Sequence, residues 1–152
     1  MEKNWKIDWS VTEIQLSYLP GDSPCLTIHK SADAYAVFKC NWDPGTICLQ
    51  ESFKMLLLNN ANQVLGLIHH TTGSVNRCVV DIRVLAAAAL KANAVKVIIA
   101  HNHPGQNANP SSQDLVLCRK IREAFALLDL ELADNLVITR DAYYSFADKG
   151  LL

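Results

Sequence analysis

The sequence predicts a single α/β domain of the mixed α+β type, in which helices flank a mixed β-sheet. Two apolar segments on either side of the polar turn 59–62 predict a β-hairpin. The short run 95–100 is β-branched and apolar on both faces, as a central buried strand should be. Segments with helical spacing are interspersed with these strands. This order, with at least one hairpin, argues against a doubly wound parallel fold.

The composition is that of an ordinary globular protein. The chain has 152 residues, of which 50% are hydrophobic and 19% charged, enough for one domain with a real core. A net charge of −1 gives no electrostatic footprint for nucleic acid or an anionic membrane, so we expect no membrane binding and no direct binding of DNA. The five cysteines form no CxxC pair, and the N-terminus lacks a signal-peptide core. We therefore expect reduced thiols and a cytoplasmic protein.

The first elements are predicted from capping and turn residues. Residues 1–30 form an N-terminal extension, with a possible strand around 14–19, which we expect to pack on the domain formed by residues 31–152. The sequence assigns no function to this extension, and one hypothesis is that it forms a contact in a homodimer. Ser31 is the expected N-cap of a helix over 32–40.

The hairpin is expected to comprise two long strands. Residues 46–58 include a stretch in which apolar and polar side chains alternate, which predicts a strand. Residues 64–71 form its partner. Glu51 falls in the middle of the first strand.

The second half of the chain is expected to alternate between helices and strands. The predicted elements are a helix over 81–93, a strand over 95–100, a loop over 101–110, a helix from Ser111, and paired strands over 131–139 and 143–146. Asp81 and Ser111 are the capping residues of the two helices. The second of these helices has apolar residues at helical spacing, namely Leu115, Cys118, Ile121, Phe125 and Leu128.

Three side chains near residue 100 predict a zinc site. His101 and His103 follow the apolar strand one residue apart, so a period of two places both imidazoles on one side. Asp114, in the first turn of the next helix, completes a set of three ligands, and three protein ligands with an open position are typical of a catalytic zinc. A plainer interpretation is a solvated loop followed by an ordinary helix cap.

Two further residues are candidates for catalysis. Glu51 is the only glutamate between Glu13 and Glu123, and a carboxylate among apolar neighbours needs a partner such as an activated water. It is therefore the candidate general base, unless it faces solvent from an edge strand. The Ser111 hydroxyl would lie near the metal and could donate to a developing oxyanion.

The spacing of these residues resembles a known family. His101-Asn102-His103-Pro104, followed by Ser111 and Asp114, is similar to the His-x-His-Pro and Ser-x-x-Asp signature of the JAMM (MPN+) metalloproteases. The fuller resemblance, over about residues 46–152, is to the RadC-like JAB domain. It adds Glu51-Ser52-Phe53, Gly73-Ser74-Val75-Asn76 and the closing Ser145-Phe146.

This resemblance implies a curved mixed sheet of the kind found in JAMM and cytidine-deaminase-like folds, with one zinc ion held by His101, His103 and Asp114. Glu51 would be the general base and Ser111 the oxyanion donor of a peptidase or isopeptidase that acts on a peptide or a protein conjugate. The family's usual histidine before the late strand is replaced by Asn135, and its usual Ser-Gly after the histidines by Gly105-Gln106.

Two other functions remain open at this point. One is a non-catalytic interaction module of a DNA repair or maintenance system, in keeping with the repair label of RadC. The absence of a helix-hairpin-helix segment before Glu51 argues against direct DNA binding. The other is a nuclease-like site for a different divalent ion, although two histidines with one aspartate suit zinc better.

Overall fold

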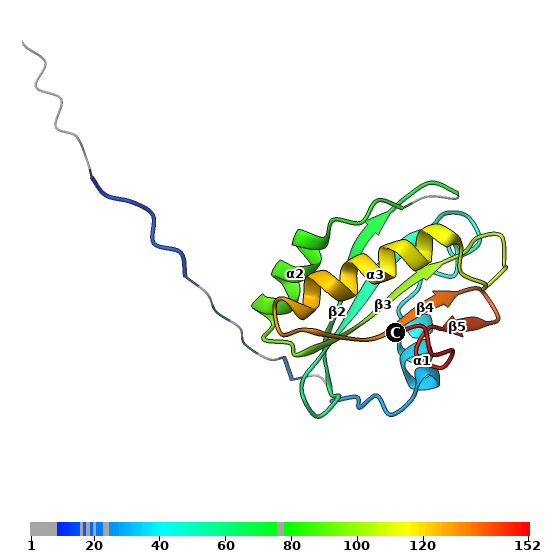
Figure 1. Ribbon diagram of the computed structural model, residues 1–152, viewed down its shortest axis with the longest axis horizontal. Coiled ribbons are helices and arrows are strands. Elements are labelled where there is room, and N and C mark those ends of the chain that lie inside the picture. Colours follow the sequence, from blue (N-terminus) through cyan, green and yellow to red (C-terminus); the bar gives the residue numbers. More distant parts are fainter. Residues whose placement is uncertain (1–8, 16, 18, 20, 23–24, 76–77) are drawn as a thin grey trace, which may run out of the picture.

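The mixed sheet flanked by helices is confirmed. The computed structural model describes residues 9–152 apart from positions 16, 18, 20, 23–24 and 76–77. Its elements, in chain order, are α1 (Ser31–Cys40), β1 (Ser52–Leu58), β2 (Val64–Thr72), α2 (Ile82–Lys91), β3 (Lys96–Asn102), α3 (Ser112–Ala126), β4 (Glu131–Ile138) and β5 (Tyr143–Ser145). The strands form one sheet in the order β2-β1-β3-β4-β5 (Figure 1).

The sheet is antiparallel except at its centre. β1 pairs antiparallel with both β2 and β3, and β4 pairs antiparallel with β5. β3 and β4 are parallel neighbours, joined by a crossover that contains α3. Parallel strands need such a long connection, and here it also carries the loop after His103 and the first turn of α3.

Helices cover both faces of the sheet and so create two cores. α2 and α3 pack on one face, where Leu85, Ile121 and Phe125 meet the sheet. α1 packs on the other face through Ala34 and Phe38. β3 is central and contributes alternate residues to each core, which explains why its sequence is apolar on both faces.

The predicted strand over 46–58 is wrong in its first half. Residues 46–50 form turns, in which the backbone N–H groups of Thr46 and Ile47 both donate to the carbonyl oxygen of Asp43 at 3.1 Å. These local hydrogen bonds use the groups that a strand would offer to its neighbours. β1 therefore begins at Ser52, and Glu51 stands just before the strand rather than in its middle.

The strand β1 is buried on both faces of the sheet. Every residue of β1 is buried, because the strand lies between β2 and β3 with a core on each side. Even Lys54 is buried, and its Nζ donates to the carbonyl oxygen of Asn41 at 2.6 Å and lies 4.7 Å from the centroid of the Trp42 ring. Burial lowers the pKa of this ammonium group.

Two of the three predicted helix caps are confirmed. Asp81 accepts a hydrogen bond from the Arg83 N–H at 2.9 Å, and Ser111 accepts one from the Asp114 N–H at 3.2 Å. Ser31 is not the cap that was predicted, because α1 already begins there. Its first turn is closed by Asp33, whose carboxylate accepts from the backbone N–H of Lys30 at 3.1 Å.

Among its described residues, the N-terminal extension joins the sheet near its end. The Val64 N–H donates to the Leu26 carbonyl at 2.8 Å, and Thr27 forms a bridge with Gln63. The described apolar residues further upstream are exposed, namely Trp9, Val11, Ile14 and Leu19. The predicted strand around 14–19 is absent at the described positions 14, 15, 17 and 19, while 16 and 18, like residues 1–8, lie outside the described residues.

No helix in the described part of the chain is long and apolar enough to cross a membrane. All five cysteine thiols are free.

The carboxyl group of Asp134 in β4 is buried, since this residue is only 4% exposed. Its Oδ1 accepts from the backbone N–H of Asn135 at 2.7 Å and of Ala147 at 3.0 Å, and its Oδ2 accepts from the Ser145 hydroxyl at 2.7 Å. Burial raises the pKa of Asp134 in spite of these hydrogen bonds.

This raised pKa predicts how stability depends on pH. The contribution of the Asp134 carboxyl group to the free energy of unfolding is fully present below its unfolded pKa of about 3.9, and it is lost as the pH rises through the higher folded pKa. Its size is about 1.4 kcal/mol for each tenfold difference in proton affinity between the folded and unfolded states. Asp134→Asn keeps the Oδ1 atom that accepts from the two backbone N–H groups, and it removes the titratable carboxyl group. The free energy of unfolding of the wild type, measured in urea relative to that of Asp134→Asn, should fall as the pH rises above about 4. A difference between the two proteins that stays constant with pH would contradict the assignment.

Candidate metal centre

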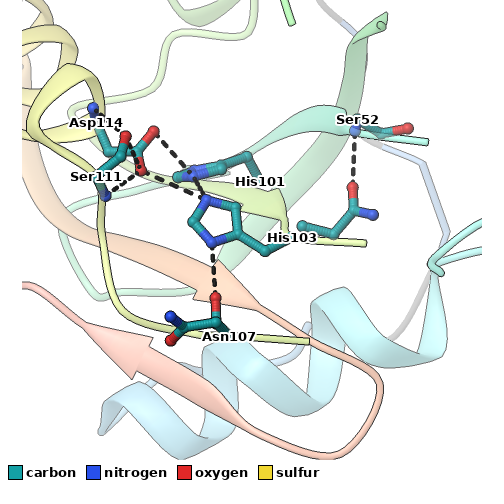
Figure 2. Close-up of polar contacts among 7 residues, drawn as sticks. Ser52, His101, His103, Asn107, Ser111 and Asp114 are labelled. Carbon is teal, nitrogen blue, oxygen red and sulfur yellow. Dashed lines mark hydrogen bonds and ion pairs between the residues drawn. The ribbon is translucent and has the colours of Figure 1, made fainter. Parts of the chain in front are cut away.

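The three predicted ligands meet at the end of β3 and the start of α3. His101 is the second-last residue of β3, His103 follows the strand directly, and Asp114 is in the first turn of α3. His101 is 3% exposed, while the other two side chains are partly open to the adjacent cleft. Figure 2 shows the three side chains pointing toward one another. The prediction that they lie together is confirmed.

Their separations are those of ligands around one small ion. The two Nε2 atoms of His101 and His103 are 3.0 Å apart. Asp114 Oδ1 lies 3.2 Å from His101 Nε2, and Oδ2 lies 3.4 Å from His103 Nε2. A tetrahedral zinc ion with bonds of about 2.0–2.1 Å spaces its ligands about 3.3 Å apart. The distances within the triad therefore fit zinc.

A hydrogen bond sets the tautomer of His103. Its Nδ1 lies 2.7 Å from the Asn107 carbonyl oxygen, which can only accept (Figure 2). Nδ1 therefore carries the hydrogen, and in the neutral ring the Nε2 lone pair is left facing the triad. This outer partner is of the kind that orients histidine ligands in metal sites.

The carboxylate of Asp114 is held on several sides. Its Oδ2 accepts from the Ser111 backbone N–H at 2.6 Å and from the Ser111 hydroxyl at 2.7 Å. Burial acts to raise the pKa of Asp114, but hydrogen bonds from His101, His103 and Ser111 outweigh it and hold that pKa far below its usual range. The same contact with Asp114 raises the pKa of His103. The carboxylate is thus ionised and ready for a cation.

Ser111 lines the same cleft but is already engaged. Its hydroxyl donates to Asp114 Oδ2 and accepts from the Asp114 N–H, which makes it the cap of α3. To donate to an oxyanion, the hydroxyl must turn from Asp114 toward the substrate. Its predicted catalytic role therefore stays a prediction, and its capping role is confirmed.

Glu51 borders the same cleft as the triad. The cleft has a volume of about 400 Å³ and is lined by Glu51, His101, His103, Ser111 and Asp114 among others. Glu51 is anchored through its backbone, since its N–H donates to the Ser74 carbonyl at 2.9 Å and its carbonyl accepts from the Gly73 N–H at 2.7 Å. Burial raises the pKa of its carboxyl, although the nearby His101 and His103 oppose this.

Asn102 was not predicted, although it holds the segment that carries Glu51. Its side chain is fully buried, and its Oδ1 accepts from the Ser52 N–H at 2.7 Å. Its Nδ2 donates to the carbonyl oxygens of Ile47 at 2.7 Å and Gln50 at 2.9 Å. The signal available in the sequence for this role was the position of an asparagine at the end of a strand, between two candidate ligands. Its partners, about fifty positions away in the sequence, could not be read from spacing.

Removal of this side chain should have a large effect on stability. Asn102→Ala leaves one N–H and two carbonyl groups without their partner in a buried place, so we expect a loss of about 2–4 kcal/mol in the free energy of unfolding. Urea denaturation would measure it. Asn109→Ala, whose side chain has no hydrogen bond among those found in the described part of the chain, is the control. A loss below about 0.5 kcal/mol, typical of a surface substitution, would show that the segment does not depend on Asn102.

Comparison with known proteins places this site in a family. The model of the RadC-like JAB domain matches residues 28–151. The chain belongs to the RadC-like JAB domain family. The resemblance inferred from the histidine, serine and aspartate spacing is thereby confirmed.

Relatives of this RadC-like JAB domain occur in several bacteria. The chain is 38% identical over 101 residues to a UPF0758 protein of Flavobacterium johnsoniae, a match covering 66% of this chain and 44% of the relative. It is 37% identical over 103 residues to the UPF0758 protein YeeS of Escherichia coli, covering 68% of this chain and 70% of the relative. For YkfG of Escherichia coli the identity is 39% over 105 residues, covering 68% and 65%. The match spans about half the length of the Flavobacterium relative.

The two departures from the RadC-like JAB pattern leave the triad intact. Asn135, at the position where a histidine was expected, is buried in β4 and is not among the described residues that line the cleft. Gln106 closes the loop after the histidines, since its Nε2 donates to the Pro104 carbonyl at 3.0 Å and its Oε1 accepts from the Arg140 N–H at 2.9 Å. Neither substitution removes a candidate ligand.

Proposed function

We propose that this RadC-like JAB domain is a zinc-dependent hydrolase of amide bonds, a peptidase or isopeptidase that acts on a peptide or a protein conjugate. The observation that carries the proposal is the triad His101, His103 and Asp114, whose separations of 3.0–3.4 Å fit zinc and which borders a cleft shared with Glu51. The free thiols are consistent with the cytoplasm as its compartment.

The donor set favours zinc over other common divalent ions. Two imidazoles and one carboxylate suit a borderline-soft ion such as zinc. Magnesium and calcium prefer sites made of oxygen ligands alone. With three protein ligands, a fourth position is left for water or substrate, as in catalytic zinc sites.

The chain's own residues supply proton transfer and orientation. Zinc, when bound, supplies Lewis-acid activation of water and of the scissile carbonyl. Glu51 takes the proton of the attacking water and passes it to the leaving amine as the C–N bond breaks, and a carboxyl with a raised pKa is suited to both steps. Ser111 lies at the start of α3, where its hydroxyl could stabilise the oxyanion once it turns from Asp114.

The charges around the cleft support an amide rather than a phosphodiester substrate. Among the described residues that line it, the charged side chains are the carboxylates Glu51 and Asp114, and none is lysine or arginine. A polyanionic backbone is normally met by cationic side chains. The interaction-module alternative does not require this arrangement and becomes the leading function only if no metal binds.

The test is metal content followed by hydrolysis. Protein purified without chelator or histidine tag should contain about one zinc per chain by elemental analysis. The zinc-loaded protein should cleave members of a mixed peptide library, detected as new amino termini. Absence of zinc after addition of the metal and removal of the excess would overturn the proposal.

A further inference from the structure

The cleft has a second half that the proposed chemistry does not use. Its lining also includes apolar side chains, and four of these belong to or pack against the core beneath α2 and α3; they are here called the apolar subsite: Phe53, Cys78, Val80 and Leu117. They come from β1, from the segment between β2 and α2, and from α3. Phe53 belongs to the core beneath α2 and α3, and the other three pack against that core.

The sequence positions place this subsite next to the triad. Phe53 is the register partner of His101, and cross-strand partners lie on the same face of a sheet with Cβ atoms about 4.5–5.5 Å apart. Leu117 follows Asp114 by three residues on α3, so both lie on one face of that helix. Two of the three candidate ligands therefore have an apolar neighbour in the subsite.

The subsite is fixed in place and partly open. Phe53 is 2% exposed and forms its floor, while Cys78, Val80 and Leu117 remain partly accessible. A cleft of about 400 Å³ is at the lower end of the usual range for small-molecule pockets, roughly 300–1,000 Å³, and suits a short peptide segment better than a folded surface.

The electrostatics of the cleft separate apolar from acidic occupants. A carboxylate in the subsite would share the cleft with Glu51 and Asp114, whose two negative charges already offset the 2+ charge of a bound zinc ion, and no lysine or arginine among the described lining residues adds positive charge. An aliphatic or aromatic side chain would instead bury surface against Phe53 and Leu117. The same pocket therefore favours one class of side chain and rejects another.

We propose that the apolar subsite binds an aliphatic or aromatic side chain adjacent to the scissile amide, so that the domain prefers Leu-sized or Phe-sized residues there and rejects Asp and Glu. This inference rests on the proposed function, because it takes the triad as the place of cleavage. It names the substrate class: peptide segments with an apolar residue flanking the cut.

Binding of small hydroxamates to the zinc-loaded protein tests this without turnover. Acetohydroxamate reports whether the metal has an open position. Two series of peptide hydroxamates then carry a Gly, Leu or Asp side chain, one series on the acyl side of the chelating group and the other on the amine side. In at least one series, the Leu compound should bind roughly tenfold to a hundredfold tighter than the Gly compound, the range for one apolar group in a hydrophobic pocket, and the Asp compound weakest.

Two neighbouring variants show whether the preference comes from the subsite. Leu117→Lys should remove the advantage of the Leu compound and raise the affinity for the Asp compound. Val116→Lys is the matched control, because Val116 is 64% exposed on the same helix and does not line the cleft. It should behave like the wild type.

The outcomes distinguish the two proposals. If acetohydroxamate binds but the Gly, Leu and Asp compounds bind alike in both series, the subsite is wrong and the metal centre stands. An unchanged preference in Leu117→Lys would also overturn the subsite. If acetohydroxamate does not bind the zinc-loaded protein, the open metal position of the proposed function is wrong, and the subsite fails with it.

Discussion

Glu51→Gln is expected to retain zinc and to lose turnover by a factor of about 10²–10⁴, the usual contribution of a general base or acid. Glutamine has nearly the same shape as glutamate but cannot accept the proton of the attacking water. Glu51 is not one of the three grouped ligands, and its backbone hydrogen bonds to Gly73 and Ser74 do not involve the side chain. The metal and the local fold should therefore survive the change.

The measurement pairs zinc content with the rate of peptide cleavage at saturating substrate. Glu131→Gln is a suitable control, because this side chain is 61% exposed on β4 and its carboxylate lies 3.9 Å from Lys96 Nζ, away from the cleft. It should keep both zinc and full activity. A Glu51→Gln protein that binds zinc and cleaves at the wild-type rate would show that Glu51 is not the general base.

The second large effect is expected for His103→Ala, which should lower zinc content from about one per chain to near zero. Alanine removes one of three ligands and also the ring that Asn107 orients. Loss of an outer partner alone typically costs 10–100-fold in metal affinity, so loss of a ligand should cost more. Turnover should disappear with the metal.

A thermal shift gives an independent readout. A ligand that binds only the folded state stabilises it by about 4 kcal/mol at a thousandfold excess over Kd, so zinc should raise the Tm of the wild type and leave His103→Ala unchanged. His69→Ala is the control, since this exposed histidine contacts Thr72 on the edge strand β2. Stoichiometric zinc in His103→Ala would contradict the ligand set.

The grouping of the three candidate ligands could be predicted because the information is local. His101, His103 and Asp114 lie within fourteen positions, on a strand end and a helix start whose geometry is regular. Period-two alternation and the capping serine at 111 were sufficient to place the three side chains together. The order of strands and helices followed from similarly local patterns.

The surroundings of Glu51 could not be predicted because they depend on distant contacts. Alternating residues before Ser52 resembled a strand, but hydrogen bonds to the carbonyl of Asp43 and to the side chain of Asn102 set a different path. The burial of Lys54 likewise depends on which strands flank β1, and Asn41, which directly follows α1, supplies the carbonyl group that accepts from its Nζ. Neither the path of the chain before Ser52 nor the burial of Lys54 can be read from the residues next to them in the sequence.

The hydrogen bonds between Asn102 and residues 47–52 hold the candidate base in place independently of the candidate metal ligands. The three candidate ligands lie at the end of β3 and the start of α3, whereas the candidate base lies on a separate segment, which is held by the Asn102 side chain and by backbone hydrogen bonds to Gly73 and Ser74. A local opening that released this segment would withdraw Glu51 and leave the ligand triad assembled. Under the proposed function, such an opening would stop turnover while zinc stayed bound, and the return of a few residues to their place would restore turnover without a new zinc ion.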